Sequence, residues 1–131
     1  PFRRFLSDDP EKDAECVILT ISDQCLVGYT RHHWHEMIAK LQTLNQLDPK
    51  VVAFKRIFVG CAQECSFDRA GRILVPSELR KDAGLEKTAI VVGQIDKFEV
   101  WSQARWDQQF GQLSDQIGSI CQSLAEQGIG L

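Results

Sequence analysis

The chain has 131 residues, of which 44% are hydrophobic and 25% charged, and its formal net charge is −3. This length and composition are typical of one soluble globular domain or of two small ones. No apolar run approaches the ~20 residues of a membrane span, and no signal peptide opens the chain. The 5 scattered cysteines are an odd number, which favours reduced thiols over a disulfide framework. We therefore expect a cytoplasmic protein without a membrane partner.

The first half of the chain predicts two short strands followed by a helix. The strands cover residues 16–21 and 25–29 on either side of the polar turn Ser22-Asp23-Gln24. Thr30 stands at the N-cap position of the helix, where its hydroxyl satisfies an unpaired backbone N–H. The helix has one apolar stripe, formed by Trp34, Ile38 and Leu41.

A second helix is predicted over residues 49–59, because Asp48-Pro49 is a helix-start signal. It offers Val51, Phe54 and Phe58 to the interior and bridges the two halves of the chain.

The next segment is a tight loop between two predicted strands. Residues 62–67 and 73–76 form the strands, and Asp68-Arg69-Ala70-Gly71-Arg72 forms the loop. Gly71 allows a positive φ without a Cβ clash. A short helix follows from Ser77 and is closed by Gly84.

An arginine at the rim of such a loop is suited to DNA. The guanidinium of Arg72 can fork onto the N7 and O6 atoms of guanine, and Asp68 can hold it in a bidentate, charge-assisted pose. This order, formed in advance, lowers the entropy cost of binding. The alternative is a surface turn with an exposed Asp–Arg pair, worth about 0–1 kcal/mol.

The second half of the chain repeats the first at a constant offset. The positions Ile18, Leu19, Leu26, Tyr29, Thr30, Trp34, Ile38 and Leu41 correspond to Ile90, Val91, Phe98, Trp101, Ser102, Trp106, Phe110 and Leu113. The repeat predicts strands over residues 89–93 and 98–101, then a helix capped by Ser102. A duplicated unit with a pseudo-two-fold axis accounts for this pattern.

The order D-x-x-G-R-I-x-x-P-x-x-L-R-x-x-A-G-L, from Asp68 to Leu85, resembles the MraZ family of bacterial transcription regulators. The resemblance extends to Leu47-Asp48-Pro49, Gly93-Gln94 and residues 98–101. It implies an α+β fold with a mainly β core, in which two tandem AbrB-like swapped-hairpin units form a small β-barrel flanked by helices. The units would cover residues 1–47 and 61–111, with a connecting helix over 48–60 and an amphipathic helix over 112–131.

The resemblance also implies a function. The protein would be a sequence-specific regulator, expected to repress the bacterial division and cell-wall gene cluster by binding promoter direct repeats as a ring-shaped homo-oligomer. It would be associated with the nucleoid, with double-stranded DNA and further copies of itself as partners and with no cofactor or small-molecule substrate. The residues expected to bind DNA are Asp68, Arg69, Gly71, Arg72 and Arg80, the last of which could equally be structural.

Two features depart from a simple DNA-binding protein. The D-x-x-G-R motif occurs once, so we expect that roughly twenty residues carrying a first copy are missing before Pro1. The net charge is negative, although six basic residues fall in one stretch and suggest a locally positive face. They are Lys55, Arg56, Arg69, Arg72, Arg80 and Lys81. Useful affinity would then need several copies on repeated sites.

Other chemistry is weakly supported. His32, His35 and Glu36 share a helix face, but the second half has no equivalent ligands, so a solvated helix turn is favoured over a metal site. Cys61 and Cys65 lack zinc-ribbon spacing. The chain has no P-loop, G-x-G-x-x-G, nucleophile elbow or H-E-x-x-H motif, so we predict that it is not an enzyme.

The segment 110–127 predicts an amphipathic helix. Its stripe consists of Leu113, Ile117, Ile120, Cys121 and Leu124. This helix either covers its own barrel or packs on a neighbouring subunit. It also motivates the main alternative function, an oligomeric scaffold or protein-interaction module without sequence-specific DNA binding. An antitoxin-like AbrB module is a further alternative, disfavoured by the helical C-terminus.

Overall fold

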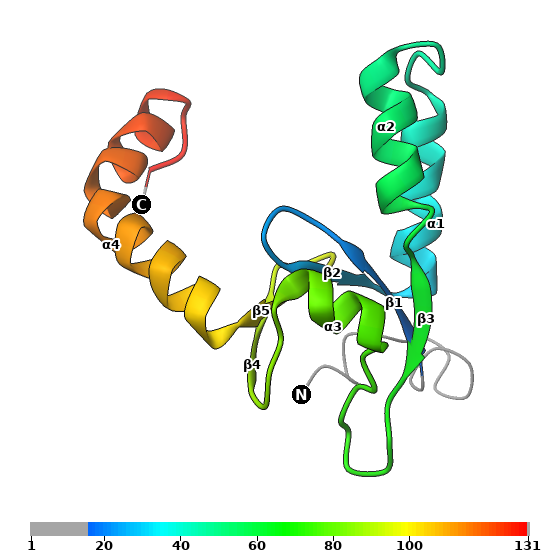
Figure 1. The fold of residues 1–131 in the computed structure, drawn as a ribbon. Helices are drawn as coiled ribbons and strands as arrows, with labels where there is room; N and C mark the ends of the chain where they lie inside the picture. The colour runs from blue at the N-terminus through cyan, green and yellow to red at the C-terminus, as the bar shows by residue number, and fades with distance from the viewer. Residues whose placement is uncertain (1–15, 131) are drawn as a thin grey trace.

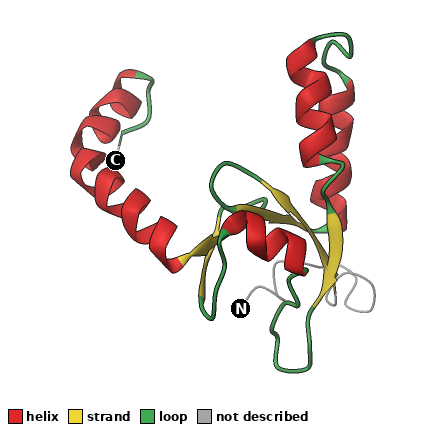
Figure 2. Ribbon diagram, viewed as in Figure 1, coloured by secondary structure: helices red, strands yellow, loops and turns green. Residues whose placement is uncertain are grey.

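The computed structural model describes residues 16–130. They form an α+β fold (Figures 1 and 2), which confirms the predicted class. In chain order the elements are β1 (Cys16–Ile21), β2 (Leu26–Tyr29), α1 (Arg31–Gln42), α2 (Pro49–Phe58), β3 (Gln63–Ser66), α3 (Ser77–Ala83), β4 (Ala89–Gly93), β5 (Phe98–Ser102) and α4 (Gln103–Glu126). The beginning of the unit expected over residues 1–47 lies outside the described residues.

The strands form one antiparallel sheet in the order β3-β1-β2-β5-β4. β3 follows the first hairpin and connecting helices in the chain, yet it pairs with β1. Among residues 16–130 the sheet is open, with β3 and β4 at opposite edges, so these strands do not form the closed barrel that the resemblance implied. Three strands, β1, β2 and β5, lie between the edge strands β3 and β4. Closing the sheet into a barrel would require the strands to tilt and shift in register until β3 and β4 met.

The internal repeat is present in the structure as two equivalent hairpins. Ile18 pairs with Tyr29 in the first hairpin, and Ile90 pairs with Trp101 at the same register in the second. The helix caps are equivalent too. The Thr30 side chain accepts a hydrogen bond from the backbone N–H of His33, and Ser102 accepts one from Arg105.

The sheet is covered on both faces. α3 packs Leu79 and Ala83 onto one face in the larger core, whose other buried members are Val17, Leu19, Leu26, Cys65, Phe67, Phe98 and Val100. On the opposite face, Val27 and Tyr29 pack against Phe58 of α2. The Thr20 hydroxyl donates a hydrogen bond of 2.5 Å to the Phe58 carbonyl, which ties α2 to β1.

Two local predictions are wrong. Phe54 of α2 is 41% exposed rather than interior, although Phe58 is buried as expected. Residues 73–76 do not form a strand; they pair with the β3 side only through a bridge between Ile73 and Phe67 and a hydrogen bond from the Leu74 N–H to the Ser66 carbonyl. Pro76 ends the pairing because it has no N–H to donate.

The elements around the sheet leave it in opposite directions (Figure 1). The α1–α2 hairpin and α4 extend as two separate arms, while the loop between β3 and α3 projects on the other side of the sheet. No helix within residues 16–130 is long and apolar enough to cross a membrane.

Candidate nucleic-acid interface

The projecting loop is a closed turn of the backbone. Its base is held by the Phe67–Ile73 bridge, and the Asp68 N–H donates to the Arg72 carbonyl at 2.8 Å. Within the turn, the Gly71 N–H donates to the Asp68 carbonyl at 3.0 Å, and Gly71 has the positive φ of 80° that the sequence predicted. Glycine adopts this conformation without a steric penalty, which is why the loop turns at this residue.

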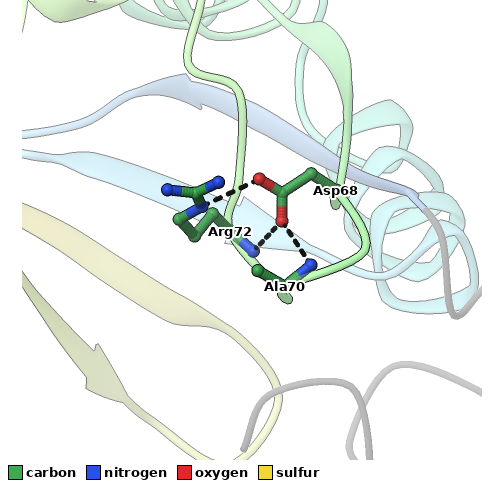
Figure 3. Close-up of polar contacts among 3 residues, drawn as sticks. All are labelled: Asp68, Ala70 and Arg72. Atoms are coloured by element: carbon green, nitrogen blue, oxygen red, sulfur yellow. Dashed lines mark hydrogen bonds and ion pairs between the residues drawn. The ribbon is translucent and has the colours of Figure 1, made fainter.

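The side chain of Asp68 organises the turn (Figure 3). Its Oδ1 accepts hydrogen bonds from the backbone N–H groups of Ala70 at 2.9 Å and Arg72 at 2.8 Å. Its Oδ2 accepts a third from the Nε of Arg72 at 2.8 Å. The hydrogen bond from the backbone of Arg72, together with its guanidinium charge, lowers the pKa of the Asp68 carboxyl below its usual value.

The pairing of Asp68 with Arg72 is confirmed, but it is not bidentate as predicted. Oδ1 is occupied by backbone N–H groups, so only Oδ2 and Nε join the two side chains. This geometry orients the guanidinium and leaves both of its terminal amino groups unused by Asp68. The Arg72 side chain is 79% exposed, whereas that of Asp68 is 28% exposed. The loop therefore presents a pre-oriented fork of hydrogen-bond donors to solvent.

The other predicted site residues lie in two places. Arg69 and Gly71 are exposed in the same turn as Arg72, and Arg80 is exposed on α3, the helix that follows the loop. The Arg80 carbonyl accepts the Leu85 N–H at 2.9 Å as α3 ends. Lys55 and Arg56 belong to α2, in the hairpin arm on the other side of the sheet (Figure 1). The basic residues thus do not form a single positive face.

One residue that supports the site was missed from the sequence. Arg105, in the first turn of α4, donates through Nη1 to the carbonyls of Asp82 at 3.1 Å and Gln24 at 3.3 Å. It thereby links α4 both to the end of α3 and to the β1–β2 turn. Gln109 adds a hydrogen bond of 2.8 Å from its Nε2 to the Gln24 Oε1. Because these partners are distant in sequence, no local pattern indicates the contact.

The alternative metal and thiol sites have little to support them. The His32 Nε2 lies 2.8 Å from the Glu36 Oε1 on the exposed surface of α1. Residues 16–130 contain no group of three or more His, Cys, Asp or Glu side chains placed to hold a metal ion. Burial raises the pKa of the Cys65 thiol to about 11 and that of Cys25 to about 12, which disfavours the reactive thiolate.

Comparison with known proteins finds similarity to one sequence family. Residues 58–120 match a sequence family described as "MraZ protein, putative antitoxin-like". The chain is 36% identical to a Hydrogenovibrio crunogenus protein over 127 residues, covering 94% of this chain and 84% of that protein. It is 39% identical to a Tolumonas auensis protein over 108 residues, covering 82% and 70%. Both relatives are named transcriptional regulator MraZ.

A Shewanella pealeana protein of the same name is 43% identical over 96 residues, which cover 73% of this chain and 63% of that protein. The chain thus spans a little less than two thirds of the length of such Shewanella relatives. The matched family segment includes the whole projecting loop, α3, the second hairpin and most of α4. With the similarity to the Hydrogenovibrio and Tolumonas proteins over most of their length, this shows that the chain belongs to the MraZ family.

Proposed function

We propose that this protein is a transcription regulator that binds double-stranded DNA through the loop 68–72. The relatives' shared name, transcriptional regulator MraZ, supports the regulatory role. The reading group is the guanidinium of Arg72, which forks onto the N7 and O6 edge of a guanine in the major groove. Arg69, on the same turn, contacts the phosphate backbone, and Arg80, exposed on the following helix α3, adds a further contact.

The observation that carries this proposal is the bond between Asp68 Oδ2 and Arg72 Nε on a projecting turn. Fixing Nε leaves the two amino groups of the guanidinium as a planar pair of donors, which is the shape that a guanine edge accepts. Because the side chain is already ordered, less conformational entropy is lost on binding. Gly71 and Ala70 keep the tip of the loop small, so the backbone can approach the groove closely.

A single loop would bind weakly. The net charge is −3, and few basic residues lie near the loop to neutralise phosphates, whose contacts supply most non-specific affinity. We propose that the protein binds direct repeats in a promoter as a ring-shaped homo-oligomer, so that several loops act together. The two tandem swapped-hairpin units that the resemblance implies are part of this proposal. Occupation of the promoter of the division and cell-wall cluster would then repress it by blocking polymerase.

Fluorescence-anisotropy titration tests the base-reading step. A duplex with G-rich direct repeats is compared with a scrambled duplex over a salt series. Arg72→Ala should weaken binding to the repeats by about 1–3 kcal/mol and relax the preference at one base pair. Arg56→Ala is the matched control, because this exposed arginine lies on α2, on the far side of the sheet. Equal losses for both variants, or an unchanged preference in Arg72→Ala, would contradict base reading by the loop.

A scaffold or protein-interaction role is the second candidate, and the exposed apolar residues of α4 favour it. The same titration separates the two functions. A scaffold would bind the repeat and scrambled duplexes equally at every salt concentration, with or without Arg72.

A further inference from the structure

A pocket with a volume of about 520 Å³ lies where the start of α1 meets strands β1 and β3 (Figure 1). Its lining residues come from α1, from β1 and β3, and from the turn between α2 and β3. Pockets that bind small molecules typically measure ~300–1,000 Å³. None of the residues 68–72 lines this pocket, so it is separate from the proposed DNA-binding loop.

Regular secondary structure brings the lining residues together. Arg31, Trp34 and His35 are three and four residues apart, so α1 places them on one face. Ile18 of β1 pairs with Glu64 of β3. Paired residues of antiparallel strands lie side by side on the same face of a sheet. The pocket therefore has a helix face on one side and an apolar residue beside a carboxylate on the other.

One positive and one negative side chain meet at the pocket. The Arg31 Nη2 lies 3.0 Å from the Glu64 Oε1, and the two side chains are 40% and 62% exposed. An exposed ion pair of this kind contributes only about 0–1 kcal/mol to stability, so a ligand can replace it at little cost. A ligand with a single charge would have the same sign of charge as one of these two side chains. A ligand with both charges would complement the pair.

The remaining lining is largely apolar. Ile18 is buried, and Val59, just after α2, is partly exposed. The Trp34 ring is held in place by stacking on Phe58, with centroids 5.4 Å apart, and by a tilted contact with Tyr29 at 5.8 Å. A fixed aromatic ring beside aliphatic residues is suited to an apolar group of a ligand.

The second half of the chain does not repeat these charges. The positions equivalent to Arg31 and His35 are Gln103 and Asp107 at the start of α4. The Gln103 Nε2 donates a hydrogen bond of 3.0 Å to the Asp107 Oδ1, so these two side chains bond to each other within the helix. The ion pair between helix and strand thus distinguishes the first unit from the second.

From these observations we propose that the pocket binds a free α-amino acid with an apolar side chain. The carboxylate of the ligand pairs with the Arg31 guanidinium, which can hold it through two hydrogen bonds. The ammonium group pairs with the Glu64 carboxylate, and the apolar side chain contacts Ile18, Val59 and Trp34. Both charges of the zwitterion then have a partner, and neither Arg31 nor Glu64 is left beside a like charge.

Strand β3 connects the pocket to the loop 68–72. Glu64 lies within the strand, and the Phe67–Ile73 bridge that follows it closes the base of the loop. A ligand that separates Glu64 from Arg31 acts on the strand that supports the loop. We therefore expect the bound amino acid to change the affinity for DNA, a step that rests on the proposed function, whereas binding of the amino acid does not.

Isothermal titration calorimetry of the full chain without DNA tests the site. The probes are phenylalanine and leucine, compared with N-acetyl-phenylalanine, which keeps only the carboxylate, phenylalanine amide, which keeps only the ammonium group, and glycine, which has no apolar side chain. Phenylalanine or leucine is expected to bind, and the three comparison probes to bind more weakly by about tenfold or more. Failure of both phenylalanine and leucine to bind would overturn the proposal. An N-acetyl form that binds as tightly as the free amino acid would also overturn it, in favour of a simple anion site.

Two variants remove one charge each, Arg31→Gln and Glu64→Gln. Both should bind the free amino acid more weakly by about tenfold or more. Glu64→Gln should also lose the preference for phenylalanine over its N-acetyl form, and Arg31→Gln the preference for phenylalanine over its amide. A purely structural role of the ion pair would leave these preferences unchanged, and that result would overturn the assignment of the two charges.

Glu36→Gln is the matched control. It removes a carboxylate from another exposed ion pair of α1, that between His32 and Glu36, and neither residue lines the pocket. This variant should bind the amino acid like wild type, and circular dichroism should report native folding in all three variants. An equal loss of binding in Glu36→Gln would contradict a site between Arg31 and Glu64.

The outcome is separable from the proposed function. Anisotropy titration of the repeat duplex with and without phenylalanine or leucine measures the coupling, which should be present in wild type and absent in Glu64→Gln. A bound amino acid that leaves the affinity for the duplex unchanged would overturn the coupling through β3. A protein that binds the amino acid but does not discriminate DNA would contradict the proposed function alone, and one that discriminates DNA but binds no amino acid would contradict this inference alone.

Discussion

At the scale of single residues, Asp68 divides two tasks between its two oxygens. Oδ1 holds the backbone of the turn through Ala70 and Arg72, and Oδ2 holds the Arg72 side chain. An amide can still accept the backbone hydrogen bonds but lacks the charge that pairs with the guanidinium. The two tasks can therefore be separated by substitution.

We predict that Asp68→Asn weakens binding to the repeat duplex less than Asp68→Ala, and that neither loses more than Arg72→Ala. The asparagine keeps the turn and loosens only the guanidinium, whereas alanine loses both sets of hydrogen bonds. Anisotropy titration of the three variants against the same duplex measures the order. Equal losses for asparagine and alanine would mean that the backbone bonds to Oδ1 do not matter for binding.

The pH dependence of this contact follows from the direction of the shift. Because the Asp68 pKa is lowered in the folded loop, the ionised form is favoured there. The contact therefore stabilises the folded loop fully above the ordinary pKa of aspartate. This stabilisation is lost as the pH falls through the lowered pKa of Asp68. Binding measured between neutral and mildly acidic pH should thus show no titration of this group.

At the scale of elements, the repeat explains why much of the fold was predictable. Short apolar runs on either side of polar turns, together with the caps Thr30 and Ser102, determine both hairpins and the starts of α1 and α4 locally. The turn at Gly71 was predictable because few other residues adopt its φ. What could not be predicted depends on partners far away in the chain. Arg105 bonds to Gln24 across the fold, and the strand order that keeps the sheet open arises from long-range pairing.

The place where the two hairpins meet gives a prediction about stability. A Cβ added to Gly28 of β2 would lie 2.2 Å from the Phe98 ring of β5, inside the larger core. We expect Gly28→Ala to lower the free energy of unfolding by about 1–3 kcal/mol, because the packed ring must shift. Urea denaturation followed by circular dichroism measures the change.

Gly111→Ala is the matched control for this substitution. Gly111 lies within α4, and an added Cβ there has no atom within 4 Å. Alanine favours the helix over glycine by about 1 kcal/mol, so this variant should be as stable as wild type or more so. A Gly28→Ala protein that also matches wild type would show that β5 can move away from β2 without cost.

At the scale of the whole molecule, the sheet separates two surfaces. The loop 68–72 lies on one side, and α4 and the α1–α2 hairpin extend on the other (Figure 1). Contacts made by the arms therefore leave the loop accessible. If several loops bind one duplex, the linked copies gain affinity without any new contact at the loop.

We predict that Leu113→Glu with Ile117→Glu leaves affinity for a duplex with one repeat unchanged. The same variant should lose most of the additional affinity for a duplex with several repeats, a gain of the order of 10²–10⁴ in linked systems. Anisotropy titration of both duplexes with both proteins measures the difference. If the variant loses as much affinity for the single-repeat duplex as for the duplex with several repeats, α4 contributes to DNA binding by the loop itself. Arg105, which links α4 to the end of α3, could provide that support.

The opposite placement of loop and arms has a consequence for how such proteins diverge. Substitutions at the tip of the turn and substitutions along α4 fall on different surfaces, so each set can change while the other stays fixed. Two gene copies could acquire different operator preferences and still recognise each other's arms. Mixed assemblies would then recognise composite operators that neither parent binds well, whereas a change on α4 would be enough to isolate one lineage from the other.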